Sequence, residues 1–356
     1  MTAKPWASSS ITLKDVAERV GVTSAAASMA LADSPRISSK TKEAIRRAAR
    51  ELGYVPSSAG RALRSQRSGA VALIVPNTSQ HVFGHSYFMH VLTGVSSAAN
   101  ARDIQVVLST TSEEAGDVAA YQRVVRSRSA DGAIVTSAAV TDSNLEALVA
   151  SGLPVVLIGN FPYLPAAVTV GIDDVAASWA MTEHLLDVHG RSRLVHVTGP
   201  LDHQTGIDRR QGFLDAVSSS GPGTSATVLE GDFSESSGRQ AIETLIARDA
   251  SFDGIVFAND DMAFGGLETL KARGIGVPDD VSLVGFDDFG LSRVTTPGIT
   301  TMSVPAERMA RIATERLFDL IDGVEDGPLR QELPVSMVIR ASCGCGRGTR
   351  TLTAPR

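Results

Sequence analysis

The sequence has few cysteines and no long apolar run. Two cysteines in 356 residues are too few for a disulfide framework. No apolar run approaches the ~18 residues that a membrane helix needs. The first twenty residues, MTAKPWASSSITLKDVAERV, lack the apolar core of a secretory signal, and a charged fraction of 20% excludes intrinsic disorder. We therefore expect a folded cytoplasmic protein that does not contact membranes.

The motifs that identify common α/β enzymes are also missing. We find no G-x-G-x-x-G after a strand, no phosphate-binding P-loop and no G-x-S-x-G nucleophile motif. Aspartate and histidine are plentiful, but no spacing assigns an acid–base pair. We therefore expect neither an enzyme nor a cofactor.

The formal net charge of −6 hides an uneven distribution. Residues 1–67 contain twelve Lys and Arg against five Asp and Glu, a formal charge of +7, so the remaining residues carry −13. The length allows two or three domains at about 100–200 residues each. A basic head on an acidic body indicates that the head binds a polyanion, although a solvated basic face would give the same count.

Three helical patterns follow one another in residues 11–55. A capping box opens the first helix at Thr12, and Gly21 ends it. A second helix follows Thr23 or Ser24, and a third follows a serine pair. Two short helices joined by a glycine turn and braced by a third are typical of a helix-turn-helix DNA-binding domain. A generic three-helix protein-binding module is the alternative.

The second helix consists almost entirely of small residues, Ser24-Ala25-Ala26-Ala27-Ser28-Met29-Ala30. Small side chains let a helix lie deep in the major groove, where alanine and methionine can contact thymine methyl groups. We expect direct base contacts mainly from Ser24 and Ser28, and phosphate contacts from Thr23, Thr41 and Arg36.

Residues 56–68 carry a marginal helical pattern. A proline and two serines can start a helix, but Gly60 and the short length make it unstable alone. A segment that folds only when two copies meet on DNA would fit, with Leu63 as an apolar wedge in the minor groove. A flexible linker, which the composition favours, is the alternative.

From Ala70 onward, apolar β-rich runs alternate with helical patterns. Continuous apolar strands separated by amphipathic helices indicate parallel α/β layers, here in two doubly wound lobes. The eight expected strands cover residues 70–76, 105–111, 132–136, 154–160, 193–199, 226–231, 254–260 and 281–288.

Polar residues follow these strands, where ligands bind in open parallel sheets. They include Asn77, Thr136, Asn160, Asn259 and Asp287. An arginine at 209 and a phenylalanine at 233 complete a set that is typical of a site for a hydroxyl-rich or planar ligand. The same residue types also cap helices, and for residues 260 and 288 the spacing favours capping.

Two groups of possible metal ligands give weaker signals. His81, His85 and His90 are close in sequence, but Gly84 argues against a helix at 81–85 and no carboxylate or cysteine lies nearby. The cysteines at 343 and 345 lack a second Cys/His pair at a zinc spacing. We therefore expect no metal site and interpret the cysteine pair as the end of a terminal strand.

The head contains T-L-K-D-V-A-E-R-V-G-V-T followed by R-I-S-S-K-T-K-E-A-I-R-R-A-A-R-E-L-G-Y-V-P. The core contains Gly-Pro-(x)8-Arg-x-x-Gly-Phe at 199–213, Gly-Asp-Phe-Ser at 231–234, Ala-Asn-Asp at 258–260 and Val-Gly-Phe-Asp-Asp at 284–288. In order and spacing these motifs resemble the LacI/GalR family of bacterial transcription regulators, whose core is a periplasmic-binding-protein-like effector domain. The resemblance continues to about Gly346.

The resemblance implies roles for matched residues. Leu63 would be the hinge leucine that inserts at the centre of the operator. Arg209 and Asp287 would hold effector hydroxyl groups, Asn259 would assist and Phe233 would stack on the ligand. Tyr87-Phe88 would line the first-lobe side of the cleft, after a loop at 80–85 that is longer than expected.

Three departures limit what carries over from the family. The recognition helix has Ala26-Ala27-Ser28-Met29 where Thr-Val-Ser-Arg is usual, and Ala32 replaces an asparagine. The hinge has Ser57-Ser58 in place of Asn-Arg, and Gly159-Asn160 stands where an aspartate is common. The operator motif of typical members is therefore not expected here.

The resemblance and the residue patterns together predict two sets of contacts. The predicted DNA contacts are Thr12, Leu13, Lys14, Thr23, Ser24, Ala25, Ser28, Met29, Arg36, Thr41, Tyr54, Ser57, Gly60 and Leu63. The predicted effector contacts are Asn77, Tyr87, Phe88, Thr136, Asn160, Arg209, Phe233, Asn259 and Asp287.

The expected fold is an all-α helix-turn-helix head with a hinge helix, followed by a two-lobed α/β core with doubly wound parallel sheets. The expected segments are a disordered arm (1–10), the head (11–55), the hinge (56–68), the core (69–346) and a disordered tail (347–356). Within the core, the first lobe is expected at about 69–168 and 300–325, and the second at about 169–298 and 328–342.

These expectations lead to a DNA-binding transcriptional regulator, most simply a repressor, whose operator affinity a small molecule controls. Two heads on two half-sites imply a homodimer on a near-palindromic operator, and the absence of a terminal heptad-repeat helix argues against tetramerisation. A sugar or sugar derivative is the expected effector, and a nucleobase or other metabolite is the alternative. A solute-binding receptor would need an export signal and no basic head.

Overall fold

The computed structural model describes residues 11–31, 33–54, 67–112, 118–324, 326–346 and 350–353. The chain divides into two compact units, Met1–Ser68, which contains the head, and Gly69–Arg356, which is the core. The arm expected at 1–10 and the hinge positions Ser57, Gly60 and Leu63 lie outside the described residues. No helix in the described ranges is long and apolar enough to cross a membrane.

The head consists of α1 (Leu13–Val20), α2 (Ser24–Leu31) and α3 (Ser39–Leu52). Thr12 and Asp15 form the predicted capping box, in which the Asp15 carboxylate accepts the Thr12 backbone N–H at 2.7 Å. Gly21 ends α1 at a φ of +75°, a conformation that glycine adopts without strain. The hydroxyl of Thr23 accepts the Ala26 N–H at 3.1 Å and so caps α2. The predicted helices and caps are therefore confirmed.

The head has its own small apolar core. One face of each helix is buried there, and the fully buried side chains are Val16, Ala17, Ala27, Ala30, Ile45, Ala48 and Ala49. Alanine is the commonest residue in this core because the three helices approach each other closely. The opposite face of α2 lies outside the core and can contact a partner.

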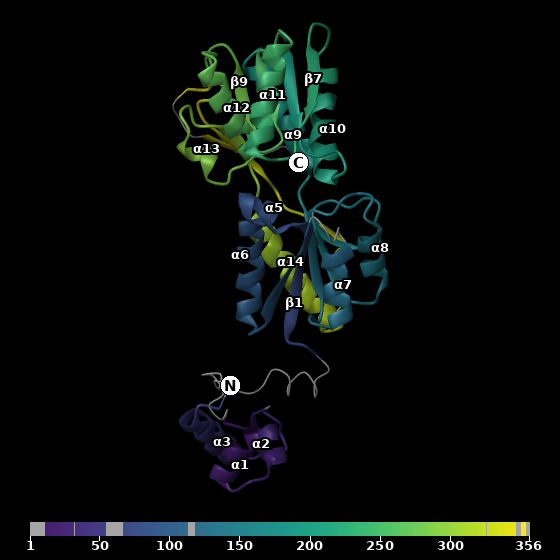
Figure 1. Cartoon of the computed structure of the whole chain (residues 1–356), viewed down its shortest axis with the longest axis vertical. Helices are drawn as coiled ribbons and strands as arrows, with labels where there is room; N and C mark the ends of the chain where they lie inside the picture. Colours follow the sequence, from purple (N-terminus) through teal and green to yellow (C-terminus); the bar gives the residue numbers. More distant parts are fainter. Residues whose placement is uncertain are drawn as a thin grey trace, which may run out of the picture. The chain divides into compact units, whose positions relative to one another are not determined.

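The core contains two mostly parallel sheets (Figure 1). The first has the strand order β11-β5-β4-β3-β1-β2 and the second the order β13-β12-β10-β9-β8-β6-β7. The first sheet comprises β1 (Ala70–Thr78), β2 (Gln105–Thr111), β3 (Ala133–Thr136), β4 (Val155–Ile158), β5 (Val168–Gly171) and β11 (Arg330–Glu332). The second comprises β6 (Arg193–Thr198), β7 (Ser225–Glu230), β8 (Gly254–Phe257), β9 (Ser282–Asp287), β10 (Thr300–Ser303), β12 (Ser336–Ile339) and β13 (Arg350–Thr353).

Helices cover both faces of each sheet. The first lobe has α5 (Ser79–Gly84), α6 (Ser86–Ala101), α7 (Val118–Ser127), α8 (Ser143–Ala150) and α14 (Ala306–Ile321). The second has α9 (Asp174–Glu183), a π-helical turn η1 (His184–Val188), α10 (Gln204–Ser219), α11 (Glu235–Ala247), α12 (Asp260–Ala272) and α13 (Leu291–Val294). In Figure 1, α6 and α14 lie side by side along one face of the first sheet, and they contact each other extensively.

The alternation of side chains along the strands explains these layers. In β1, Val71, Leu73 and Val75 belong to the apolar cluster with α6 and α14, while Ala72 and Ile74 belong to the cluster with α7 and α8. Successive strand residues point to opposite faces, so a fully apolar strand is buried on both. Both lobes have the doubly wound order in which the first strand lies between the second and third, and ligand sites form at that switch point.

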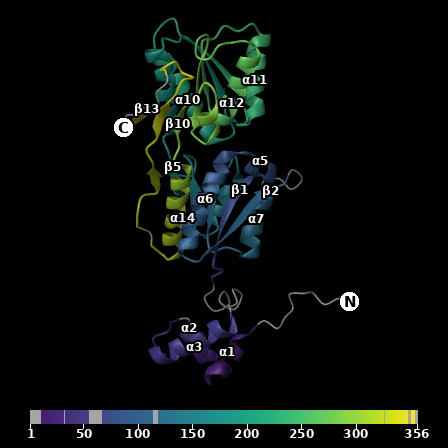
Figure 2. The same cartoon turned by 90° about the vertical axis from the view of Figure 1, so that its left-hand side faces the viewer.

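The chain passes between the lobes three times. It crosses after β5, returns between β10 and α14, and crosses again between β11 and β12. The yellow C-terminal part of the chain therefore belongs to both lobes in Figure 2. The sequence analysis assigned residues from about 300 to 325 to the first lobe. This was wrong for β10, which pairs with β9 in the second sheet. The assignment of residues from 169 and from 328 to the second lobe was wrong for β5 and β11, which pair with each other in the first sheet.

All eight predicted strands are present, but other elements were missed. Residues 350–353 of the expected disordered tail form β13, which pairs antiparallel with β12; the rest of the tail lies outside the described residues. A helix was not expected at 81–85, yet α5 covers Ser79–Gly84, because the Thr78 hydroxyl caps it by accepting the His81 N–H at 3.2 Å.

Candidate functional site

The head presents a polar surface around the start of α2. Thr23, Ser24 and Ala25 are exposed, while Ser28 and Met29 are half-buried on the same helix. Thr12, Lys14 and Arg36 are exposed as well, and Thr41 is half-buried at the start of α3, where its N–H bonds to the Ser38 hydroxyl. Leu13 and Tyr54, by contrast, pack against the head core.

Ion pairs connect α3 to the turn after α2. Asp33 has a left-handed φ of +58° and its carboxylate lies 3.0 Å from Lys42 Nζ and 2.7 Å from Arg46 Nη2. The hydrogen bond from Lys42, followed by its charge, lowers the pKa of Asp33. These ion pairs engage Lys42 and Arg46 of α3 and connect this helix to the turn that follows α2.

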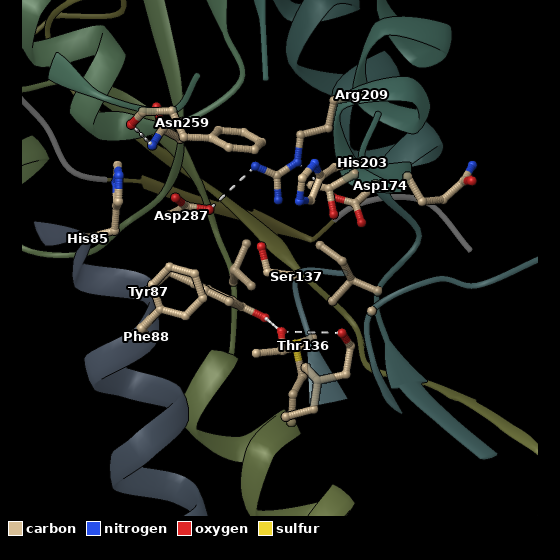
Figure 3. A pocket seen from close by; sticks show the side chains of 18 of the residues that line it. His85, Tyr87, Phe88, Thr136, Ser137, Asp174, His203, Arg209, Asn259 and Asp287 are labelled. Carbon is tan, nitrogen blue, oxygen red and sulfur yellow. Dashed lines mark hydrogen bonds and ion pairs between the residues drawn. The ribbon is translucent and has the colours of Figure 1, made fainter. Parts of the chain in front are cut away.

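A cleft lies between the two lobes of the core. The space enclosed by its lining residues is about 1030 Å³, which includes the part open to solvent. Eight of the nine predicted effector residues line it: Tyr87, Phe88, Thr136, Asn160, Arg209, Phe233, Asn259 and Asp287. Figure 3 shows polar side chains from both lobes pointing into this space.

Asn77, the ninth predicted residue, does not line the cleft. Strand β1 continues to Thr78, two residues further than predicted, and the side-chain oxygen Oδ1 of Asn77 accepts the Thr78 N–H at 3.3 Å. The polar residue therefore remains part of the strand end rather than lying beyond it.

Arg209 is the central charged group of the cleft. It is 6% exposed, and its Nε donates to Asp174 Oδ1 at 2.7 Å. Its Nη1 donates to the carbonyl of Ala258 and lies 3.5 Å from Asp287 Oδ1. None of the described residues accepts a hydrogen bond from Nη2, so this nitrogen can donate to a ligand.

Asp287 is the carboxylate that faces the ligand space (Figure 3). Its side chain is 13% exposed, and its contact with Arg209 is long for a hydrogen bond. Burial raises the pKa of Asp287 well above its usual range, against the lowering effect of the Arg209 charge. A buried carboxyl group with so few partners among the described residues is suited to accept hydrogen bonds from ligand hydroxyl groups.

Aromatic rings form the apolar part of the cleft. The Tyr87 hydroxyl lies 3.1 Å from the Thr136 hydroxyl, and burial raises the pKa of Tyr87 to about 12. The rings of Tyr87 and Phe289 lie 6.3 Å apart between centroids. Such rings can pack on the apolar faces of a sugar ring or on a planar base.

Phe233 and Asn259 are held by the fold of the second lobe. Phe233 has a φ of +67°, and its ring lies on Gly199, where a Cβ would come within 2.0 Å of the ring. Asn259 caps α12 through the Met262 N–H at 3.0 Å and donates to the Phe233 carbonyl at 2.8 Å. Both ends of the Asn259 amide are engaged, so this residue positions the aromatic loop.

Three contacts join the lobes across the cleft. Asn160, from the first lobe, donates to Asp208 Oδ2 of α10 at 2.8 Å. The ring of His85 lies 3.4 Å from Asp261 Oδ2 of α12. The N–H of Val140 donates to the Asp202 carbonyl at 2.7 Å. A change of lobe angle would break these polar contacts.

Sequence reasoning missed several residues of the cleft. Asp174, the closest carboxylate to Arg209, begins α9 just after β5, a strand too short to be noticed. Phe289 also lines the cleft, and it follows a strand that was predicted. Phe289 lies one residue beyond the predicted strand 281–288, and Asp174 lies three residues beyond β5.

The comparisons with known proteins follow the same division of the chain. Residues 12–57 match the family model described as bacterial regulatory proteins, lacI family, and residues 182–343 match a periplasmic binding protein-like domain. The chain is 32% identical over 339 residues to the HTH-type transcriptional regulator CelR of Thermobifida fusca, which covers 93% of this chain and 98% of that protein.

Two solved structures are similar over nearly the whole chain. The transcriptional regulator CelR–cellobiose complex has a TM-score of 0.72 at 30% identity and covers 93% of this chain and 99% of its own. The lac repressor dimer bound to operator and the anti-inducer ONPF has a TM-score of 0.82 at 24% identity. The match covers 94% of this chain and 99% of the lac repressor chain, and it supports the fold. The chain therefore belongs to the LacI family of bacterial regulatory proteins.

Proposed function

We propose that this regulator is a cytoplasmic repressor that binds a near-palindromic operator as a homodimer and responds to a small sugar in the cleft of its core. The exposed start of α2 contacts bases, and the basic head contacts phosphates. The ligand lies between the lobes and changes the lobe angle, which alters the spacing of the two hinge segments.

The arrangement of Arg209 and Asp287 carries the ligand assignment. Arg209 Nη2 is a donor without a partner among the described residues, and Asp287, whose Oδ1 lies 3.5 Å from Nη1 of the same guanidinium group, is an acceptor. Neighbouring hydroxyl groups of a sugar both donate and accept, so they can bind this pair at once. The aromatic rings of Phe233 and Tyr87 supply surfaces for the C–H faces of the same sugar.

The similarity to CelR supports the same assignment. A solved structure of CelR is a complex with cellobiose, a sugar. The cleft is lined by residues of both lobes, so a sugar bound there would contact both of them.

A thermal-shift screen tests the ligand class. Purified protein is heated with monosaccharides, disaccharides and nucleobases in parallel, and we expect a disaccharide or monosaccharide to raise the melting temperature. Ligand at 100 times its Kd adds about 2.7 kcal/mol of stability. Stabilisation by a nucleobase alone would contradict the sugar assignment.

A gel-shift titration with the identified ligand tests the repressor mechanism. A DNA fragment from upstream of the gene is bound by the protein, and we expect the sugar to weaken this binding. Unchanged DNA affinity at saturating sugar would show that the cleft does not control the head.

A further inference from the structure

Four side chains that commonly bind metals meet at one end of the second lobe. His184 begins η1 and His189 follows it, while Cys343 and Cys345 come after β12. One donor atom of each lies within 4.8 Å of the other three. Within the described ranges, no other group of His, Cys, Asp or Glu side chains comes together in this way.

Three of the distances within this group, those among His184, His189 and Cys345, match the spacing of ligands around a single ion. The two Nε2 atoms of His184 and His189 are 3.3 Å apart. The sulfur of Cys345 lies 3.3 Å from His189 Nε2 and 3.6 Å from His184 Nε2. Tetrahedral Zn²⁺, with Zn–N of about 2.05 Å and Zn–S of about 2.3 Å, gives N···N edges of about 3.3 Å and S···N edges of about 3.5 Å.

Hydrogen bonding alone does not satisfy this arrangement. The Nε2 atom of a neutral imidazole offers either one proton or one lone pair. Here each Nε2 faces two other donor atoms at once, the second imidazole and the Cys345 sulfur. A metal ion at the centre can accept a lone pair from every one of them.

The backbone is shaped to bring the ligands together. A π-helix bonds residues i and i+5, so the turn η1 places His189 beside His184 rather than on another face. Gly344 separates the cysteines at a φ of +108°, and a Cβ there would lie 3.1 Å from His189 Nδ1. Glycine therefore allows both the chain reversal and the close approach of the imidazole.

The surroundings favour the forms of the ligands that bind metal. The Thr300 hydroxyl lies 3.1 Å from the buried Cys343 sulfur and can donate to a thiolate there. Cys345 is exposed, which leaves a route for an ion to enter.

We propose that His184, His189, Cys343 and Cys345 bind one Zn²⁺ ion in a tetrahedral Cys₂His₂ site. All four positions are filled by protein, which is typical of a structural zinc site and leaves no place for a reacting water. The ion ties the chain that follows β12 to the end of the α9–η1 segment, and so anchors the carboxyl end of β12 in the second lobe.

Cobalt substitution tests the site in the full-length protein. The protein is prepared without a histidine tag, reduced so that the cysteines are thiols, stripped with a chelator and titrated with Co²⁺. We expect one equivalent to give the intense visible bands of tetrahedral cobalt and a thiolate-to-metal charge-transfer band, both of which Zn²⁺ removes. Octahedral cobalt spectra, or no binding below millimolar concentration, would overturn the proposal.

Variants assign the ligands. Cys345→Ser is the main variant because this side chain is exposed and its change leaves the core packing intact. We expect Cys345→Ser and His189→Ala to weaken Co²⁺ binding at least a hundredfold and to abolish the increase in Tm that Zn²⁺ produces. His90→Gln, in the first lobe, is the control and should bind like the unaltered protein. A Cys345→Ser protein with the unaltered cobalt spectrum would exclude this site.

Discussion

The guanidinium group of Arg209 lies over the ring of Phe286, with its Cζ atom 3.6 Å from the ring centroid. The ring supports one face of the group, Asp174 holds Nε and the Ala258 carbonyl holds Nη1. Three contacts therefore set the direction in which Nη2 points before any ligand arrives. Such preorganisation lowers the entropy cost of binding.

Arg209→Lys tests this preorganisation. Lysine keeps the charge, but a single ammonium group cannot make the same set of directed hydrogen bonds. Loss of a hydrogen bond to a charged group costs about 1.5–3 kcal/mol, so we expect sugar affinity to fall roughly ten- to hundredfold. Calorimetric titration measures this, and operator affinity in the absence of sugar should stay unchanged. Equal sugar affinity would mean that Nη2 does not contact the ligand.

Asp287→Ala should uncouple the ligand from the DNA. The variant loses the acceptor for the ligand hydroxyl groups but keeps the head and hinge, so we expect normal operator binding that no longer responds to sugar. Gel-shift assays with and without sugar measure the response. Glu268→Gln, a surface change on α12 that affects the pair with Lys271, is the matched control. A normal response of Asp287→Ala would remove this residue from the site.

The contact between Asn160 and Asp208 should contribute to lobe closure. It is a hydrogen bond to a carboxylate at 2.8 Å between elements of different lobes. In a double-mutant cycle with Asn160→Ala and Asp208→Ala, we expect a coupling free energy of about 1 kcal/mol in urea unfolding. The pair Asn160→Ala and Glu268→Gln serves as the control and should be additive. Additivity of the first pair would show that the contact contributes nothing.

Asp260 should make stability depend on pH. Burial raises the pKa of this carboxyl group to about 7, against an ordinary value of 3.8. Because the folded pKa is raised, the contribution of Asp260 to stability is complete below pH 3.8 and is lost as the pH rises toward 7. A difference of about 3 pKa units sets an upper limit of about 4 kcal/mol.

Asp260→Asn removes this titration. The asparagine oxygen can still accept the Asp288 N–H, and its amide can donate to the Thr301 hydroxyl, so the two contacts persist. We expect the stability of the unaltered protein relative to Asp260→Asn to decrease between pH 4 and pH 7 in chemical denaturation. Parallel curves for the two proteins would place the pKa of Asp260 near its ordinary value.

Leu63→Ser tests the hinge. Leu63 lies outside the described residues, and the prediction follows from the sequence resemblance. A polar side chain cannot serve as the apolar wedge that separates base steps. We expect specific operator binding to be lost while sugar affinity stays unchanged. Near-normal operator affinity in a gel shift would contradict the wedge assignment.

Much of the fold could be predicted because its signals are local. Capping residues such as Thr12 and Thr23 lie within three residues of the groups they bond, and fully apolar strands such as β1 are visible in any short window. Strand β10, which was missed, has the short and polar sequence TTMS, and its pairing with β9 and β12 stabilises it.

The site was predictable where the carboxyl end of a strand marks it. Asp287 was identified in this way and Arg209 from the helical Arg-x-x-Gly-Phe motif, and the structure brings them to 3.5 Å. The contacts of Asn160 with Asp208 and of His85 with Asp261 depend on how two lobes meet, which no local pattern records. The same applies to the cysteine and histidine pairs, which are more than 150 residues apart along the chain.

The three passages of the chain between the lobes have a consequence for protein engineering. Neither lobe is a continuous stretch of sequence, since the first consists of residues 69–171 with 306–332 and the second of 174–303 with 336–353. A chimera that takes one lobe from one relative and the other lobe from a second relative therefore needs three junctions, at 172–173, 304–305 and 333–335. A single protease cut at any one of these junctions leaves the two lobes joined by the other two.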